Sequence, residues 1–263
     1  RPVDAATPSL GTLTRRYGYH FSSLIAIALL MALGVSAFRA VFWATILAAA
    51  LSFLRRETAL GPRRLIRALV EGGRGVLPVA ATTATAGIIV GVVTLTGLGL
   101  KIAGIIVALA GGSVFLTVAF AAIAVWMLGL AVPVTASYII AAVMVAPALT
   151  QVGIPDVAAH MFIFYYAVLS EVSPPTALSP FAAAALTGGN PFRTMMLTWK
   201  YTLPAFLVPF VFTLSPEGMG VLLQAPPATV LVSSATAAVG VAALAVGLGG
   251  WMIGPAPIPE RAA

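Results

Sequence analysis

The stretch Ser170-Glu171-Val172-Ser173-Pro174-Pro175-Thr176 separates two apolar runs, residues 159–169 and 177–186. Each run is too short to cross a bilayer alone, because a membrane-spanning helix needs about 20 apolar residues. The proline pair excludes a continuous helix, since each proline lacks an N–H and its ring clashes with the preceding turn. We therefore predict a helix that is broken in the middle of a membrane, with polar groups at the break.

The composition defines the class of protein. Of the 263 residues, 60% are hydrophobic and only 8% are charged, whereas a soluble domain has about 25% charged residues. Lipid tolerates only helices and closed barrels, and the alternating pattern of barrel strands is absent. The sequence therefore predicts an all-α, polytopic membrane protein.

The positive charge is concentrated in one loop. The net charge is +7, and six arginines lie within residues 55–74, namely Arg55, Arg56, Arg63, Arg64, Arg67 and Arg74. Because cytoplasmic loops of membrane proteins are enriched in Lys and Arg, we expect this loop to be cytoplasmic and not to bind nucleic acid. The chain has no cysteine, which excludes disulfides, thiol catalysis and cysteine metal sites.

The first third of the chain predicts short helices. Residues 1–18 form a polar lead-in that does not begin with Met, so we expect a piece of a longer polypeptide. Residues 19–75 contain scaffold-type helices. We expect two short helices with a tight turn within residues 21–54, because this arrangement brings the arginine pairs 15/16 and 55/56 to the same, cytoplasmic side of the membrane. Residues 63–71 have a basic amphipathic pattern, which is typical of a helix on the membrane surface and also fits a solvated connector.

The remainder divides into two segments and a tail. Residues 76–192 form a transport-type unit, and residues 193–254 form C-terminal membrane helices before a polar tail at 255–263. The unit starts with a span rich in Ala, Thr and Gly (76–96), which we expect to pack inside the bundle. A re-entrant helical hairpin (113–150) turns at Gly129–Pro133, and the broken helix (156–187) follows. This gives about eight membrane elements.

The two interruptions can hold ions. A helix that ends in the membrane exposes carbonyl oxygens with partial negative charge, and one that starts there exposes N–H groups with partial positive charge. Carbonyls near residues 128–130 and 169–172 would bind Na⁺ together with hydroxyls, because hard cations take oxygen ligands. The second half-helices would start near Pro133–Thr135 and Ser173–Pro175 and attract an anion. The candidate hydroxyls are those of Thr135, Ser170, Ser173 and Thr176.

Two titratable residues lie on the broken helix. Glu171 faces the unfavourable end of the helix dipole, so it should carry a proton, pair with a cation or reach a water-filled mouth. His160 lies on the same face about 16 Å away, too far for direct contact. An interfacial or packing role for His160 is favoured over a proton relay, and Trp126, Tyr165, Tyr166 and Trp199 are expected as interfacial anchors or core.

Three stretches resemble the large membrane subunit of TRAP (tripartite ATP-independent periplasmic) transporters. They are residues 86–101, residues 128–138 and the run from 158 through Ser173-Pro174-Pro175-Thr176-Ala177-Leu178 to Gly188-Gly189-Asn190-Pro191. The likeness covers roughly residues 21–214. It is greatest to the C-terminal half of fused permeases with small and large subunits in one chain, which work with TAXI-type binding proteins.

The resemblance implies an elevator-type, Na⁺-coupled permease of the bacterial inner membrane, with no other cofactor. A periplasmic binding protein would deliver a small organic anion, a carboxylate, and small-subunit helices would complete the permease. The family has two hairpin-plus-broken-helix units, whereas this chain has one, so we expect half of a transport domain. By match to the family pattern, one Na⁺ site and one side of the substrate pocket would be lined by Gly129, Pro133, Thr135, Ser173, Pro175 and Thr176. Ser170 is a further candidate for the Na⁺ site, and Ser137 and Pro174 are further candidates for the substrate pocket.

Two other function classes are alternatives to a transporter. A structural or coupling subunit of a larger membrane complex would use the breaks for helix packing alone. An intramembrane enzyme is disfavoured, because the spans contain no Ser/His pair, acidic dyad or HExxH motif.

Overall fold

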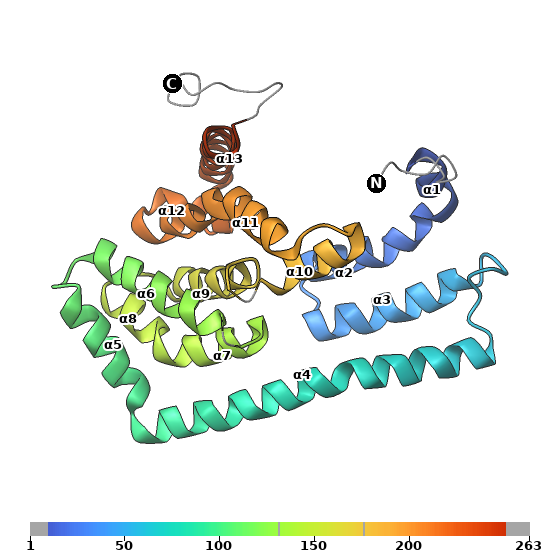
Figure 1. The fold of residues 1–263 in the computed structure, drawn as a ribbon, viewed down its shortest axis with the longest axis horizontal. Coiled ribbons are helices and arrows are strands. Elements are labelled where there is room, and N and C mark those ends of the chain that lie inside the picture. The colour runs from blue at the N-terminus through green and yellow to red at the C-terminus, as the bar shows by residue number, and fades with distance from the viewer. Residues whose placement is uncertain (1–9, 131, 176, 251–263) are drawn as a thin grey trace. The chain divides into compact units, whose positions relative to one another are not determined.

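The computed structural model describes residues 10–130, 132–175 and 177–250, and it is helical throughout, with no strand in those ranges. Contacts divide the chain into two compact units, residues 1–78 and 79–263, each described separately below (Figure 1). This agrees with the all-α, polytopic class that the composition predicts.

The first unit is built around a pair of short helices. It contains α1 (Leu10–Tyr17), η1 (Gly18–Phe21), α2 (Ser22–Ala32) and α3 (Ala37–Ser52). Gly34, with φ of +82°, allows the tight turn between α2 and α3, which lie side by side. The two-helix interpretation of residues 21–54 is therefore confirmed.

The basic residues near Arg16 and Arg55 lie at one end of this unit. The Arg16 guanidinium lies 3.1 Å from the Glu57 carboxylate, and the Tyr17 hydroxyl donates to the same carboxylate at 3.3 Å. The Arg55 guanidinium lies 5.7 Å from the centre of the Tyr17 ring. The two arginine-rich segments thus lie at the same end of the unit, as the sequence predicted.

Helix α4 corrects one prediction. It runs unbroken over Pro62–Thr96, 35 residues or about 52 Å, so the basic segment at 63–71 is its first turns and not a separate surface helix. Pro78 lies inside this helix. The segments predicted at 63–71 and 76–96 can form one helix because isolated glycines cost a helix only about 1 kcal/mol each, and membrane helices tolerate proline.

The second half of α4 is largely exposed within the described residues, and its packing inside a bundle stays a prediction. Only Ala86 and Val93 of this helix are buried, whereas Ile88 is 69% and Leu95 is 90% exposed. Ala86 packs in a small cluster with Ala136 and Ile140, and an added Cβ at Gly87 or Gly91 would meet no described atom within 4 Å. The helix ends at Gly97, whose φ of +65° matches the predicted break.

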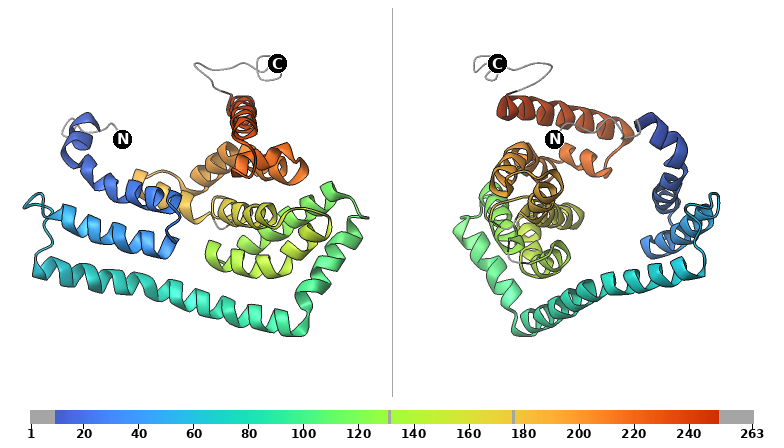
Figure 2. Two further views of the ribbon diagram at one scale, coloured as in Figure 1. Left: turned by 180° about the vertical axis from the view of Figure 1, so that it is seen from behind. Right: turned by 45° about the vertical axis from the view of Figure 1, so that its right-hand side comes forward.

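The core of the second unit lies among α5 (Leu98–Leu109), α6 (Val114–Gly129), α7 (Val134–Met144), α8 (Ala146–Gln151) and α9 (Asp156–Ser170). Helices α6 and α9 pack closely together at its centre (Figure 2). Val118 and Val125 of α6 and Phe162 and Ile163 of α9 are fully buried between these helices and their neighbours. This pairing brings the ends of α6 and α9, and so the two interruptions, to the same region.

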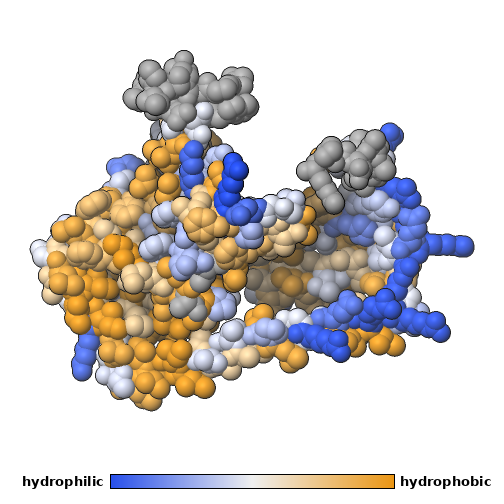
Figure 3. All heavy atoms as spheres, in the orientation of Figure 1, coloured by the Kyte–Doolittle hydropathy of each residue, from blue (hydrophilic) through white to orange (hydrophobic). Residues whose placement is uncertain are grey.

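The remaining elements are α10 (Leu178–Thr187), α11 (Pro191–Thr202), η2 (Leu203–Leu207), α12 (Val208–Leu214), η3 (Glu217–Leu222) and α13 (Pro227–Gly249). By length and composition, three helices in the described part of the chain can cross a membrane: 62–96, the continuous run 191–214, and 227–249. Six further apolar helices are 10 to 17 residues long. Apolar side chains cover much of the visible surface, as a lipid environment requires (Figure 3).

Candidate functional site

The first interruption separates α6 from α7. Helix α6 ends at Gly129, and the N–H of Leu130 donates to the carbonyls of Trp126 and Met127. Pro133 is extended (φ −58°, ψ 153°), and α7 begins at Val134. Because the first N–H groups of a helix have no acceptor within it, the start of α7 is a partly positive helix end, as predicted.

The second interruption separates α9 from α10 by seven residues. Tight turns follow Ser170: the N–H of Ser173 donates to the Ser170 carbonyl at 3.1 Å, and the N–H of Ala177 donates to the Ser173 carbonyl at 3.1 Å. The Pro174–Pro175 peptide bond is cis. Helix α10 begins at Leu178, later than the start predicted near 173–175, because Ala177 adopts a left-handed conformation (φ 35°) that the helix cannot include. Thr176 lies outside the described residues.

The two interruptions meet at Gly129. A Cβ atom added to this glycine would lie 2.6 Å from the Cβ of Ser170 and 3.4 Å from the Ser137 hydroxyl oxygen. The first separation is shorter than real Cβ contacts, so only glycine fits where α6 passes α9. The structure therefore brings together three of the predicted site residues, Gly129, Ser137 and Ser170.

The buried hydroxyls have internal partners. Ser170 donates to the Ala167 carbonyl at 2.7 Å, Ser173 donates to the Leu169 carbonyl at 2.8 Å, and both side chains are fully buried. Ser137, also fully buried, donates to the Val132 carbonyl at 3.3 Å. Donation uses the hydroxyl hydrogen and leaves oxygen lone pairs as acceptors. We call Gly129, Ser137 and Ser170, together with Ser173, whose backbone N–H is bonded to the Ser170 carbonyl, the serine cluster.

The donor set of the serine cluster fits a hard monovalent cation. It consists of hydroxyl oxygens beside the carbonyl ends of α6 and α9, and oxygen is the ligand such cations prefer. No group of three or more His, Cys, Asp or Glu side chains that could hold a metal ion occurs in the described ranges. The chemistry available here is therefore neutral oxygen coordination supplemented by helix dipoles.

The other predicted site residues are more exposed to solvent than the serine cluster. Pro133, Thr135 and Pro175 are exposed, and Pro174 is half-buried. Pro133 and Thr135 flank the start of α7, whereas the prolines 174 and 175 lie in the turns after α9. These residues border the serine cluster along the chain but do not belong to it.

Glu171 and His160 have different surroundings. Glu171 directly follows α9 and is half-buried, and the only ion pair among the described residues is Arg16–Glu57. His160 Nδ1 lies 3.1 Å from the Tyr138 hydroxyl, a contact that joins α9 to α7. This contact supports the packing role favoured for His160.

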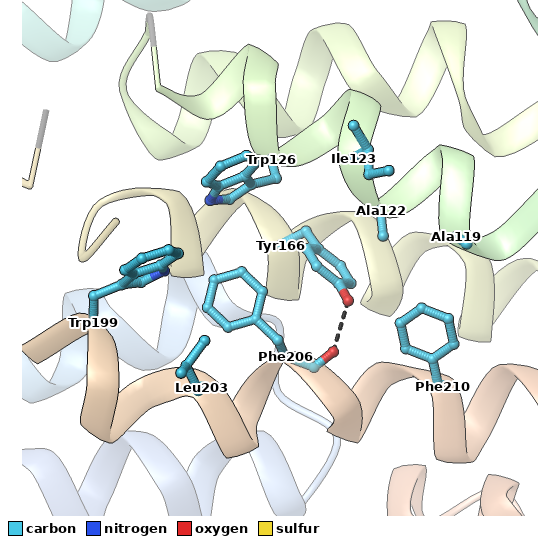
Figure 4. Close-up of a pocket in the computed structure, with 9 residues that line it drawn as sticks. All are labelled: Ala119, Ala122, Ile123, Trp126, Tyr166, Trp199, Leu203, Phe206 and Phe210. Carbon is cyan, nitrogen blue, oxygen red and sulfur yellow. Dashed lines mark hydrogen bonds between the residues drawn. The ribbon is translucent and has the colours of Figure 1, made fainter. Parts of the chain in front are cut away.

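An aromatic cavity of about 370 Å³ beside α6 and α9 is absent from the sequence-based predictions. Its lining residues are Ala119, Ala122, Ile123, Trp126, Tyr166, Trp199, Leu203, Phe206 and Phe210 (Figure 4). The first four of them recur at helical spacing and share one face of α6, which is a signal that the sequence contains. Small residues followed by one large aromatic residue on the same face leave space beside the helix.

The fold and the serine cluster define a polytopic helical membrane protein with two helix interruptions that meet inside its core. A family model described as "Tripartite ATP-independent periplasmic transporter, DctM component" matches residues 4–218. The chain therefore belongs to the DctM family, the large membrane components of TRAP transporters, and is a permease component of such a secondary transporter. No curated protein and no solved structure shows a significant match to the chain.

Proposed function

We propose that this chain forms the ion-coupling part of a Na⁺-driven TRAP permease that imports a small organic anion, specifically a carboxylate. The observation that carries the proposal is the contact of Gly129 with Ser170, where the ends of α6 and α9 meet. Both are helix C-termini and carry partial negative charge, which favours a cation between them. Discontinuous helices of secondary transporters bind coupling ions at such ends.

The coupling ion would take oxygen ligands from both interruptions. The hydroxyl oxygens of Ser170 and Ser173, the backbone near Gly129, and the hydroxyls of Thr135 and Thr176 are the proposed ligands. Glu171, half-buried at the end of α9, would balance the charge of the cation from a position open to water.

The substrate would be bound by helix N-termini. Between Arg74 and Arg193 the only lysine or arginine is Lys101, so a carboxylate has no arginine clamp within this part of the chain. The start of α7, with Pro133 and Thr135 exposed beside it, offers N–H groups and a hydroxyl instead. Ser137, Pro174, Pro175 and Thr176 would complete this side of the pocket.

The partners follow from the family. TRAP large components normally work with a substrate-binding protein and a small membrane subunit. We propose a periplasmic, TAXI-like binding protein and small-subunit helices fused to the same polypeptide. We place the permease in the bacterial inner membrane with the basic loop at 55–74 in the cytoplasm.

Uptake into proteoliposomes tests the proposal. The full-length permease, reconstituted with its binding protein, should take up a radiolabelled carboxylate when a Na⁺ gradient is applied and not when K⁺ replaces Na⁺. Ser173→Ala should lower the initial rate about fivefold, because one neutral oxygen interaction contributes about 1 kcal/mol.

Thr117→Val is the matched control for this experiment. Thr117 is also fully buried on α6 and donates to a backbone carbonyl, that of Ser113, but it lies at the other end of the helix. Uptake that proceeds equally without Na⁺ and survives Ser173→Ala would favour the alternative, a structural subunit without its own coupling site.

A further inference from the structure

The end of the first unit around Glu57 carries a large excess of positive charge. Three segments meet there: α1, the loop between α3 and α4, and the first turns of α4. Within residues 10–78 the only acidic residues are Glu57 and Glu71, and hydrophilic side chains gather over this end (Figure 3). The arginines of the three segments are Arg15, Arg16, Arg55, Arg56, Arg63, Arg64 and Arg67.

Glu57 holds the three segments together. The Arg16 guanidinium of α1 lies 3.1 and 3.2 Å from the two carboxylate oxygens of Glu57, and the Tyr17 hydroxyl donates to one of them at 3.3 Å. Arg64 of α4 donates to the backbone carbonyl of Glu57 at 2.7 Å and to that of Ala59 at 3.3 Å. The carboxylate is therefore paired with one arginine, and the loop between α3 and α4 is fixed to both helices.

Four arginines at this end are exposed, and their side chains have no hydrogen-bond or ion-pair partner among the described residues. Each of them adjoins a residue that is bonded around Glu57, or lies one turn of α4 away from one. The contacts of Glu57 thus hold like charges close together, and an anion bound between them relieves their repulsion. We call these four residues the arginine patch: Arg15, Arg56, Arg63 and Arg67.

The surface beside the arginine patch is apolar. Four apolar side chains that flank its arginines along the chain are more than 60% exposed, namely Phe53, Leu54, Ile66 and Leu69. The two helices that lead to this end, α2 and α3, also expose large apolar side chains, as helices in contact with lipid do. The arginines therefore lie where an apolar surface ends, which is the level of the lipid headgroups in a bilayer.

This combination distinguishes between anionic partners. A nucleic acid, an acidic protein segment or a free phosphate ion would pair with the arginines but leave the neighbouring apolar side chains in water. An anionic phospholipid offers a phosphate to the guanidinium groups and acyl chains to the apolar side chains. Guanidinium groups bind phosphate through two parallel hydrogen bonds, and clusters of basic residues beside membrane helices attract anionic lipids.

We propose that the arginine patch binds the phosphate groups of anionic bilayer phospholipids. The contacts of Glu57 place the patch on three segments at once, so a bound headgroup bridges α1, the loop and α4. Lipid binding thereby anchors this end of the first unit at the membrane surface. The proposal is independent of ion coupling at the serine cluster.

Lipid selectivity tests this proposal. The full-length permease in mild detergent is mixed with equal amounts of phosphatidylglycerol and phosphatidylcholine that have identical acyl chains, and bound lipids are identified by native mass spectrometry. The wild type should bind phosphatidylglycerol in preference. The variant Arg15→Gln/Arg56→Gln/Arg63→Gln/Arg67→Gln should lower the ratio of the two bound lipids at least about fivefold, because a single arginine near an anionic headgroup already contributes about that factor.

A matched variant removes the same charge from other elements. Arg39→Gln/Lys101→Gln/Arg193→Gln/Lys200→Gln also deletes four exposed positive charges, but these are dispersed over α3, α5 and α11, so the ratio should fall less than about twofold. The contacts of Glu57 are intact in both variants, and melting temperatures in detergent verify that both are folded. If the patch variant is unfolded, Arg63→Gln/Arg67→Gln replaces it and should lower the ratio at least about threefold.

Three outcomes would overturn the proposal. The first is equal binding of the two lipids by the wild type. The second is an equal loss of preference in the patch variant and the matched variant, which would show that net charge alone attracts the lipid. The third is displacement of phosphatidylglycerol by glycerol phosphate or by an acidic peptide, which would show that the partner of the patch is soluble.

Discussion

Helices α6 and α9 border two regions that are packed in opposite ways. At the serine cluster, Gly129 lies so close to Ser170 that a single added carbon would collide with it, and each buried hydroxyl has a backbone acceptor. At the aromatic cavity, less than three turns along the same helices, about 370 Å³ is open and two indole N–H groups lack an acceptor.

This difference shows which part of the second unit is closely packed and which part is not. Satisfied hydroxyls and a glycine contact fix the relative position of α6 and α9, and with it the oxygen atoms of the proposed ion site. The apolar space on the other side leaves the side chains around it with fewer neighbours. The interrupted helices are therefore closely packed on one side and loosely packed on the other.

The largest expected effect is on the closely packed region. Gly129→Ala should destabilise the protein by about 3 kcal/mol, because the new methyl group collides with the Ser170 side chain. Thermal unfolding in detergent measures this, with Gly104→Ala on α5 as control, since a Cβ there would meet no atom within 4 Å. The double variant Gly129→Ala/Ser170→Gly should recover part of the loss. Equal melting temperatures for Gly129→Ala and Gly104→Ala would contradict the close contact.

A matched pair on α6 compares the two regions directly. Ala121 is fully buried in the core, whereas Ala119, two residues earlier, lines the aromatic cavity. Ala121→Leu should cost about 2 kcal/mol through overpacking, and Ala119→Leu should change stability by less than about 1 kcal/mol. Unfolding transitions of both variants provide the measurement. If Ala119→Leu were the more damaging of the two, the cavity would not be open in the folded protein.

The hydrogen bond between α9 and η2 should have a moderate effect. Tyr166→Phe removes the hydroxyl that donates to the Phe206 carbonyl at 2.6 Å, and it should cost about 1 kcal/mol. Tyr165→Phe, the neighbouring half-buried tyrosine, should stay within about 0.5 kcal/mol of the wild type. Thermal unfolding compares the stability of the two variants. An equal loss of stability in both would show that the hydrogen bond does not hold η2 to α9.

The smallest effect is expected at the contact of Tyr138 with His160. Tyr138→Phe removes a hydrogen bond near the surface, so it should cost about 0.5 kcal/mol or less and leave uptake within about twofold of the wild type. Parallel measurements of unfolding and transport test this. A large loss of uptake with unchanged stability would instead indicate that His160 takes part in proton movement.

The sequence predicted the interruptions and the class of fold because proline pairs and apolar runs act locally. The starts and ends of α6 and α9, the start of α7 and the pair α2–α3 follow directly from such signals, whereas the division of the second hairpin arm into α7 and α8 does not. Local signals did not predict how the segments pack. The contact of Gly129 with Ser170 depends on helices that are distant in sequence. The role of Gly129 in particular comes from a neighbour 41 residues later.

The candidate site was predicted only in part for the same reason. Hydroxyls near a helix break could be named from sequence, but their burial and acceptors could not, because these depend on the packing of α6 against α9. The aromatic cavity was missed because each of its residues is ordinary alone. Only the placement of α11 and η2 against α6 turns Trp126 and Trp199 into donors without acceptors.

The most direct test of the central claim is Na⁺ binding by the purified permease, measured by calorimetric titration without substrate. The account predicts that the wild type and Thr117→Val bind Na⁺ equally and that Ser173→Ala binds it about fivefold more weakly, because one oxygen ligand is lost. Equal Na⁺ affinity in all three proteins, with Ser173→Ala folded, would contradict a coupling site at the meeting point of the two interruptions.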